Sequence, residues 1–161
     1  MAKLKSPSDL DELRKQIVGQ RDTEKPCVSV CGGASCLALG ADRILEEFKR
    51  LMKERGLEDR VYMRETGCPG FCERGPIVTI YPEATCYVQV KPEDVPEIVE
   101  ETLIGNRVVE RLVYREPVTG EQVVKESEIP FYKHQVRLLM SNATVVNPTT
   151  IDDYIATGGY E

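Results

Sequence analysis

Four cysteines in two short loops are the residues whose types and spacing could do chemistry. Four residues separate Cys31 from Cys36, and three separate Cys68 from Cys72. Between the two pairs lie 31 residues, enough for a helix and a strand that return the second loop beside the first. Four converging thiolates suit an iron–sulfur cluster or a structural zinc ion, and little else.

The spacing of the cysteines bears on which metal they would hold. Structural zinc sites usually pair cysteines two residues apart, in domains small enough to need the ion for folding. Neither pair here has that spacing, so the pattern favours a binuclear iron–sulfur cluster over an interaction domain stabilised by zinc on four cysteines, which remains the alternative. Neither pair is Cys-x-x-Cys, which makes thiol–disulfide chemistry the least favoured interpretation.

The residues around the cysteines predict an environment for negative charge. The loop glycines allow positive φ and let backbone N–H groups point at sulfur without a side chain between; they are Gly32, Gly33, Gly67 and Gly70. Cys36 is expected at the N-terminus of the helix that follows, where the helix dipole favours an anion. Such contacts stabilise thiolates and help to set a reduction potential.

Composition limits the classes of function. The chain has 161 residues, a net charge of −6 and 30% charged residues, which predicts one acidic domain with arms and makes nucleic acid a poor partner. No apolar run approaches the roughly 20 residues of a membrane helix, and no secretory signal is recognisable. We therefore expect a cytoplasmic protein without membrane insertion. In that reducing compartment, metal ligation explains clustered thiols better than disulfides do.

The pattern of apolar residues predicts the elements that must position the loops. Periodicity and turn residues indicate a helix over 8–19, a linker over 21–26, a strand over 27–31, a helix over 37–56, strands over 60–65, 77–81 and 85–90, and a helix over 94–103. The order β-α-β then β-β-α is typical of thioredoxin-like domains. We expect an α/β fold in which helices pack on a four-stranded mixed sheet.

Three segments are predicted along the chain. Residues 1–25 form an N-terminal helix and linker, 26–111 the main domain, and 112–161 a C-terminal arm. The arm is expected to contain short helices over 131–140 and 148–157. Its apolar stripe is expected to pack against this domain or another one, and consists of Phe131, Val136, Leu139 and Met140.

Several of these motifs resemble a known family. The sequences Cys-Gly-Gly-x-x-Cys, Glu65 to Pro76, Ile80 to Glu83 and Val90 to Val95 are similar to the thioredoxin-like [2Fe-2S] ferredoxin domain. The resemblance is to the version at the N-terminus of flavin-carrying NADH dehydrogenase-type subunits, which include relatives of the complex I NADH-oxidising subunit and electron-bifurcating hydrogenase beta subunits. The tail is similar to the lead-in before the flavin domain of those subunits, at Ile129 to Lys133 and Ile151 to Tyr160.

The resemblance implies a function. It implies a one-electron carrier with a [2Fe-2S] cluster, held by Cys31, Cys36, Cys68 and Cys72, within an NADH-linked oxidoreductase complex. The implied partners are a flavin/NADH-binding domain or subunit and other iron–sulfur subunits, and a second copy of the chain is a further candidate. The glycine-rich FMN and NADH motif of the family does not occur here, so we expect an N-terminal piece that cannot oxidise NADH by itself.

Residues near the proposed ligands have simpler expected roles. Cys27 and Cys86 are expected to be buried apolar residues on strands. Phe71 is expected to cover the second loop, and Pro76 fits either a cis or a trans peptide bond.

Overall fold

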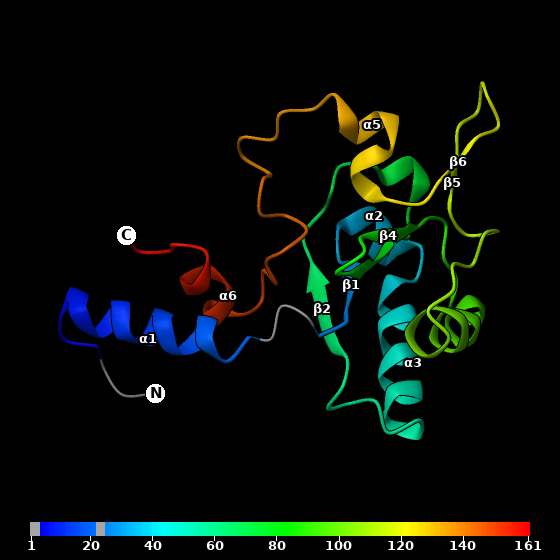
Figure 1. Cartoon of the computed structure of the whole chain (residues 1–161). Coiled ribbons are helices and arrows are strands. Elements are labelled where there is room, and N and C mark those ends of the chain that lie inside the picture. The colour runs from blue at the N-terminus through cyan, green and yellow to red at the C-terminus, as the bar shows by residue number, and fades with distance from the viewer. Residues whose placement is uncertain (1–3, 22–24) are drawn as a thin grey trace.

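A four-stranded mixed sheet lies at the centre of the computed structural model, which describes residues 4–21 and 25–161 (Figure 1). The strands lie in the order β2-β1-β3-β4 and are β1 (Cys27–Cys31), β2 (Tyr62–Thr66), β3 (Val78–Tyr81) and β4 (Thr85–Tyr87). Strand β1 runs parallel to β2 and antiparallel to β3, and β3 runs antiparallel to β4. The predicted α/β class and four-stranded mixed sheet are confirmed.

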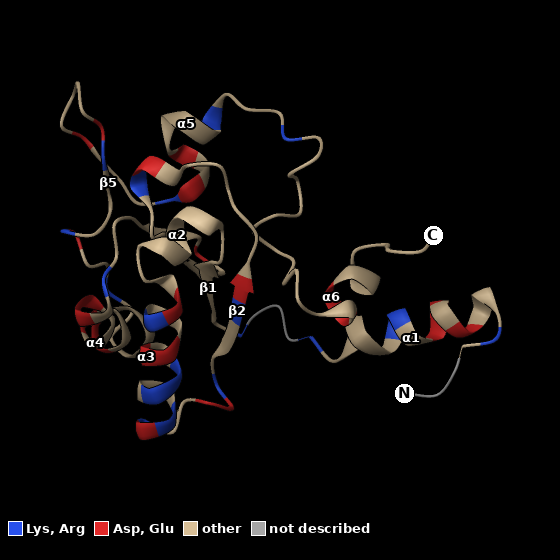
Figure 2. Ribbon diagram, turned by 180° about the vertical axis from the view of Figure 1, so that it is seen from behind, with Lys and Arg blue, Asp and Glu red and all other residues tan. Residues whose placement is uncertain are grey.

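Helix α3 (Ala41–Glu54) supplies much of the layer on this sheet. Its buried residues Ile44, Phe48 and Leu51 recur at three- and four-residue steps, so they share one face of the helix. Figure 2 shows that basic and acidic residues alternate along α3. The helix packs on β1 and beside α4 (Val95–Ile98). The 3-10 turn η2 (Pro92–Asp94) precedes α4, and the π-helical turn η3 (Val99–Ile104) continues it.

The single helix predicted over 37–56 is wrong, because the chain forms two helices there. Helix α2 (Ala34–Ala38) ends before Gly40, whose φ of +94° is costly for any residue with a Cβ, and α3 then begins at Ala41. Leu37 is exposed and does not share the buried face of α3 as predicted. Because of this break, the short helix that follows the first cysteine loop is separate from α3.

The strand bounds also differ from the predicted ones. Strand β2 begins at Tyr62 and reaches Thr66, directly before the second cysteine loop. Strand β4 ends at Tyr87, short of the predicted residue 90, and Gln89 two residues later has φ +52°. The backbone N–H of Val88 donates instead to the carbonyl oxygen of Leu112.

The chain beyond residue 111 joins the main core before it leaves the sheet. Strands β5 (Tyr114–Arg115) and β6 (Gln122–Val123) form a hairpin, followed by the 3-10 turn η4 (Glu126–Glu128) and helix α5 (Pro130–Lys133). The core cluster includes Leu112, Tyr114, Ile129 and Tyr132. This part of the predicted arm therefore helps to bury the sheet.

The helix predicted over 131–140 is wrong beyond Lys133, where α5 ends. Val136 is 88% exposed and Leu139 is 97% exposed, and Met140 is exposed as well. Of the four stripe residues, Phe131 is the one that packs on another ring, at Phe71. Within the described residues the stripe as a whole does not pack on this domain, and its packing against another domain stays a prediction.

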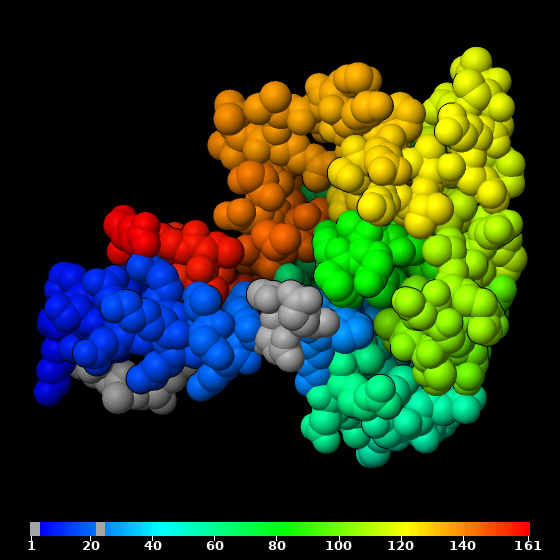
Figure 3. Space-filling model, in the orientation of Figure 1, coloured from blue at the N-terminus to red at the C-terminus, as the bar shows by residue number. Residues whose placement is uncertain are grey.

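The first and last helices lie side by side. Helix α1 (Pro7–Gly19) is capped by Ser6, whose Oγ accepts a hydrogen bond from the Asp9 N–H. Arg14 of α1 donates from Nε to the carbonyl oxygen of Ile155 in α6 (Ile151–Ala156), at 2.9 Å. Figure 3 shows α1 and the C-terminal residues projecting together beside the main body. Part of the linker predicted over 21–26 lies outside the described residues.

Candidate metal centre

The first cysteine loop leaves the end of β1 and enters α2. Cys31 is the last residue of β1 and Cys36 lies within α2, and both are buried. The Gly32 N–H donates to the carbonyl oxygen of Thr66 at 2.8 Å, which ties the start of this loop to the end of β2. Because the second loop begins directly after β2, the parallel pairing of the two strands brings both loops to one edge of the sheet.

The second loop holds its two thiols close together. The Sγ atoms of Cys68 and Cys72 lie 3.5 Å apart, and Cys72 begins the 3-10 turn η1 (Cys72–Arg74). The Gly70 N–H donates to the Cys68 sulfur at 3.3 Å. Gly70 has φ +92°, a conformation that glycine allows and other residues rarely adopt. Cys72 is exposed and Cys68 is half-buried, so the site opens to the surface on this side.

Glycine also provides room between the loops. A Cβ at Gly33 would lie 2.9 Å from the Cys68 Cβ, 3.3 Å from the Cys68 Sγ and 3.5 Å from the Cys31 Sγ. The backbone of the first loop therefore passes directly against thiols of both loops. A Cβ at Gly75 would lie 2.7 Å from the Cys36 Sγ. The position of Gly75 beside Cys36 was not predicted, because nothing in the local pattern links two residues so far apart in sequence.

One prediction about these loops needs correction. Positive φ is open to all four loop glycines, and of these only Gly70 has it; Gly33 has φ −64° and is required for space. Cys36 was expected at the N-terminus of the long helix, but it lies within the five-residue α2. Cys36 is the third residue of α2 and is separated from the long helix α3 by the break at Gly40.

Hydrogen bonds and burial shift the pKa values of the free thiols. A hydrogen bond from Cys31 lowers the pKa of Cys36 to about 7, and the Ile77 N–H adds to this effect. The same hydrogen bond is the largest cause of the raised pKa of Cys31, and burial is the second. A hydrogen bond from the Gly33 N–H opposes this rise. Burial is the main cause of the raised pKa of Cys68, and the hydrogen bond from the Gly70 N–H acts in the opposite direction. The prediction that loop N–H groups point at sulfur is confirmed for Gly33 and Gly70.

The thiols are arranged as two pairs. Cys31 and Cys36 are hydrogen-bonded to each other, and Cys68 and Cys72 lie in van der Waals contact. Across residues 4–21 and 25–161, no group of three or more His, Cys, Asp or Glu side chains is gathered closely enough for one metal ion. Two thiol pairs on facing loops, with N–H groups directed at sulfur, fit a binuclear cluster in which each iron takes two thiolates.

Comparison with known families agrees with this chemistry. The sequence model of the thioredoxin-like [2Fe-2S] ferredoxin family matches residues 17–103. The chain belongs to this family. As a ferredoxin-type electron carrier, it is expected to bind a [2Fe-2S] cluster.

Relatives of this ferredoxin come from several bacteria. A 2Fe-2S ferredoxin of Clostridium pasteurianum is 40% identical over 77 residues, which span 48% of this chain and 76% of the relative. A 2Fe-2S ferredoxin of Aquifex aeolicus is 41% identical over 80 residues, 49% of this chain and 72% of the relative. The crystal structure of the wild-type thioredoxin-like [2Fe-2S] ferredoxin of Aquifex aeolicus matches with a TM-score of 0.52 at 36% identity, and the match covers 58% of this chain and 99% of the other.

The two remaining cysteines of this ferredoxin lie in the sheet. Cys27 is at the opposite end of β1 from Cys31, paired with Tyr62 and Tyr81, and Cys86 is fully buried on β4. Burial raises the pKa of Cys27 and raises that of Cys86 to about 12. Both are buried strand residues, as predicted.

The Gly75–Pro76 peptide bond that follows η1 is cis, one of the two forms that the sequence allowed. In the part of the chain that the structure describes, no helix has the length and apolar character needed to cross a membrane.

Proposed function

We propose that this electron carrier is a module of an NADH-linked oxidoreductase complex, of the NADH dehydrogenase or bifurcating hydrogenase type. We also propose that Cys31, Cys36, Cys68 and Cys72 hold its [2Fe-2S] cluster. The observation that carries the ligand proposal is the close approach of the two loops at Gly33, beside the sulfurs of Cys31 and Cys68.

The work of the chain in this role is to hold and shield the cluster. A [2Fe-2S] cluster, when bound, accepts and releases one electron at a time. The buried pair Cys31 and Cys36 would fix the inner side, and the more exposed pair Cys68 and Cys72 would face a partner. The N–H groups of Gly33, Gly70 and Ile77 would stabilise thiolate charge.

Two observations support membership of a larger complex. Two segments of the tail, Ile129 to Lys133 and Ile151 to Tyr160, are similar to the lead-in of flavin-carrying subunits. In the stretch between them, Val136, Leu138 and Leu139 are almost fully exposed. A Cβ at Gly67 would lie only 3.2 Å from the carbonyl oxygen of Ala143, so this stretch passes beside the second cysteine loop. Exposed apolar side chains near an electron carrier suit a surface that a partner covers.

Metal analysis of the purified protein tests the ligand proposal first. We expect two irons and two acid-labile sulfides per chain, and an EPR signal from the reduced protein. Colourless protein with one zinc per chain would contradict the proposal and would instead favour the zinc-stabilised interaction domain.

Anaerobic reduction tests the proposed complex. NADH alone should leave the cluster oxidised, whereas NADH with a catalytic amount of the flavin-carrying NADH dehydrogenase-type subunit should reduce it. Leu139→Glu should slow this reduction several-fold, and Val118→Glu, at an equally exposed apolar residue of the β5–β6 turn, should not. A cluster that dithionite reduces, but that NADH and the flavoprotein leave oxidised, would refute membership of the complex.

A further inference from the structure

Four aromatic rings gather beside the second cysteine loop. Phe71, directly before Cys72, stacks on Phe131 with ring centroids 4.4 Å apart and an interplanar angle of 8°. Tyr114 and Tyr132 each approach Phe71 with centroids 5.7 Å away. Phe71 is buried as a result. Its three ring partners all lie beyond residue 103, where the match to the ferredoxin family ends.

Phe131 also reaches the backbone of the loop itself. A Cβ at Gly70 would lie 4.0 Å from Cε1 of Phe131, so the ring lies over Gly70 as well as over Phe71. These two residues stand between Cys68 and Cys72 along the chain. Phe131 is itself 36% exposed, so one side of its ring meets the loop and part of the rest meets solvent. It therefore covers the part of the loop between the two cysteines, while the Cys72 side chain itself is exposed.

Water near an iron–sulfur cluster changes its reduction potential. One-electron reduction adds a negative charge, and water stabilises that charge better than an apolar ring does. A ring that keeps water from the loop between Cys68 and Cys72 therefore disfavours the reduced form. Removing the ring should raise the reduction potential.

We propose that Phe131, stacked on Phe71, is a positioning residue that keeps water from the loop between Cys68 and Cys72 and lowers the reduction potential of the bound cluster. This inference rests on the proposed ligand assignment. It gives the segment after the ferredoxin domain a role in electron transfer that does not depend on any partner.

The test is the midpoint potential of the full chain, measured by redox titration of the EPR signal. Phe131→Ala should shift the potential to a more positive value, and Phe131→Tyr, which retains a stacked ring, should restore it. Tyr160→Ala is the matched control: it removes an aromatic ring from the same C-terminal segment, where Tyr160 packs edge-on against Tyr154 of α6. It should leave the potential at the wild-type value.

A second measurement distinguishes shielding from packing alone. Bleaching of the visible spectrum by an iron chelator should be several-fold faster in Phe131→Ala than in the wild type. If Phe131→Ala does not retain iron, Phe131→Gln keeps more of the side-chain volume but brings a water-binding polar group, and the same positive shift is expected of it.

The outcomes separate this inference from the proposal it rests on. A loaded Phe131→Ala or Phe131→Gln protein with wild-type potential would overturn the role of Phe131 and leave the ligand assignment intact. A wild-type protein without iron would overturn the ligand assignment, and the role of Phe131 with it.

Discussion

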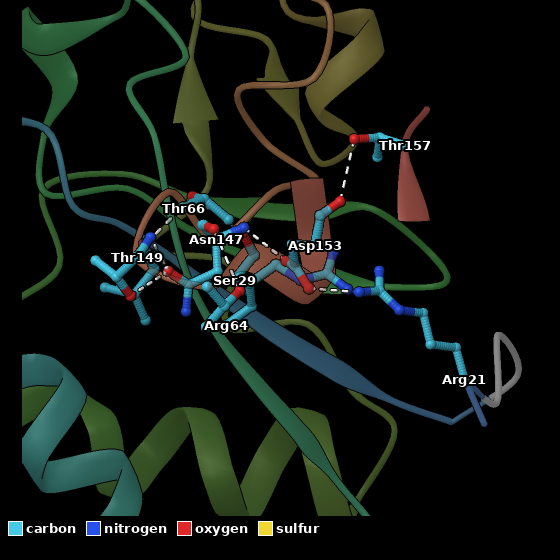
Figure 4. Close-up of polar contacts among 10 residues, drawn as sticks. Arg21, Ser29, Arg64, Thr66, Asn147, Thr149, Asp153 and Thr157 are labelled. Carbon is cyan, nitrogen blue, oxygen red and sulfur yellow. Dashed lines mark hydrogen bonds and ion pairs between the residues drawn. The ribbon is translucent and has the colours of Figure 1, made fainter. Parts of the chain in front are cut away.

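The carboxylate of Asp153 in α6 accepts a hydrogen bond at 2.5 Å from the guanidinium of Arg21, which lies 132 positions earlier (Figure 4). The same carboxylate accepts from the Asn147 N–H at 2.6 Å and lies 3.7 Å from the guanidinium of Arg64 on β2. Asp153 is only 3% exposed. One buried carboxylate thus joins the end of the N-terminal helix, the edge of the sheet and the C-terminal segment.

Asp153→Asn should destabilise the protein, because it keeps the shape of the side chain but removes the charge that two guanidinium groups face. A hydrogen bond to a charged group contributes more than one between neutral groups, so we expect the free energy of unfolding to fall by about 1–3 kcal/mol. Chemical denaturation measures the change. The visible spectrum of the cluster should be retained, since these contacts of Asp153 involve neither cysteine loop.

Asp152→Asn is the matched control for this prediction. It makes the same change one residue away in α6, at a carboxylate that is partly exposed and is not a partner in these contacts of Asp153. We expect a change below about 0.5 kcal/mol. Equal effects of the two substitutions would show that the Arg21–Asp153 contact contributes little.

Serine substitutions test which cysteines hold the cluster. Replacing Cys31, Cys36, Cys68 or Cys72 with serine should weaken or abolish iron binding, because each substitution removes a soft thiolate ligand. Cys27→Ser and Cys86→Ser should retain the wild-type iron content and visible spectrum, since these side chains lie in the sheet. Loss of the spectrum in either control, with its retention in one of the four, would contradict the assignment.

Alanine substitutions at glycine test the close approach of the loops. Gly33→Ala would place a methyl group 2.9 Å from the Cys68 Cβ, and Gly75→Ala would place one 2.7 Å from the Cys36 Sγ. Both contacts are too short, so the loops must separate, and we expect the iron content to fall at least several-fold. Gly19→Ala, which meets nothing within 4 Å, should load normally. Full loading of Gly33→Ala would mean that the loops are farther apart than described.

Local patterns were sufficient to predict the sheet and the main helix. The helical spacing of Ile44, Phe48 and Leu51 predicts an amphipathic helix. The β-branched run at Val78 to Ile80 predicts a buried strand. The break at Gly40 could not be predicted in the same way, because a glycine within an amphipathic pattern can be tolerated in a helix or can end it. The role of Leu112 in the core depends on long-range packing, which no local pattern encodes.

The candidate ligands were predictable for a different reason. Cysteine alone among the standard residues provides a thiolate, so the identity and spacing of Cys31, Cys36, Cys68 and Cys72 restrict the chemistry directly. What surrounds them was harder to predict, since Gly75 and Phe131 come close to the site only in the folded chain. The exposed stretch after Lys133 was predicted as a helix because its apolar residues recur at helical spacing, and that pattern does not distinguish a buried face from an unpartnered one.

Tyr87→Phe tests whether the chain beyond residue 103 is part of the cooperative fold. The hydroxyl of Tyr87, which is fully buried on β4, lies 2.6 Å from the Thr102 Oγ1 and accepts a hydrogen bond from the Val109 N–H at 3.1 Å. Without the hydroxyl, the buried Val109 N–H loses its partner, which costs about 1–3 kcal/mol. We expect the free energy of unfolding to fall by that amount in denaturant titration. The loss should appear in a single transition followed both by far-UV circular dichroism and by cluster absorption.

Tyr62→Phe provides the comparison for Tyr87→Phe, because Tyr62 is half-exposed on the edge strand β2 and its hydroxyl can bond to water. It should change the free energy of unfolding little. If Tyr87→Phe were equally mild, or if it produced an early transition without loss of the cluster, residues 104–114 would unfold independently of the sheet. The segment that carries Phe131 toward the cysteine loop would then be only loosely joined to the ferredoxin domain.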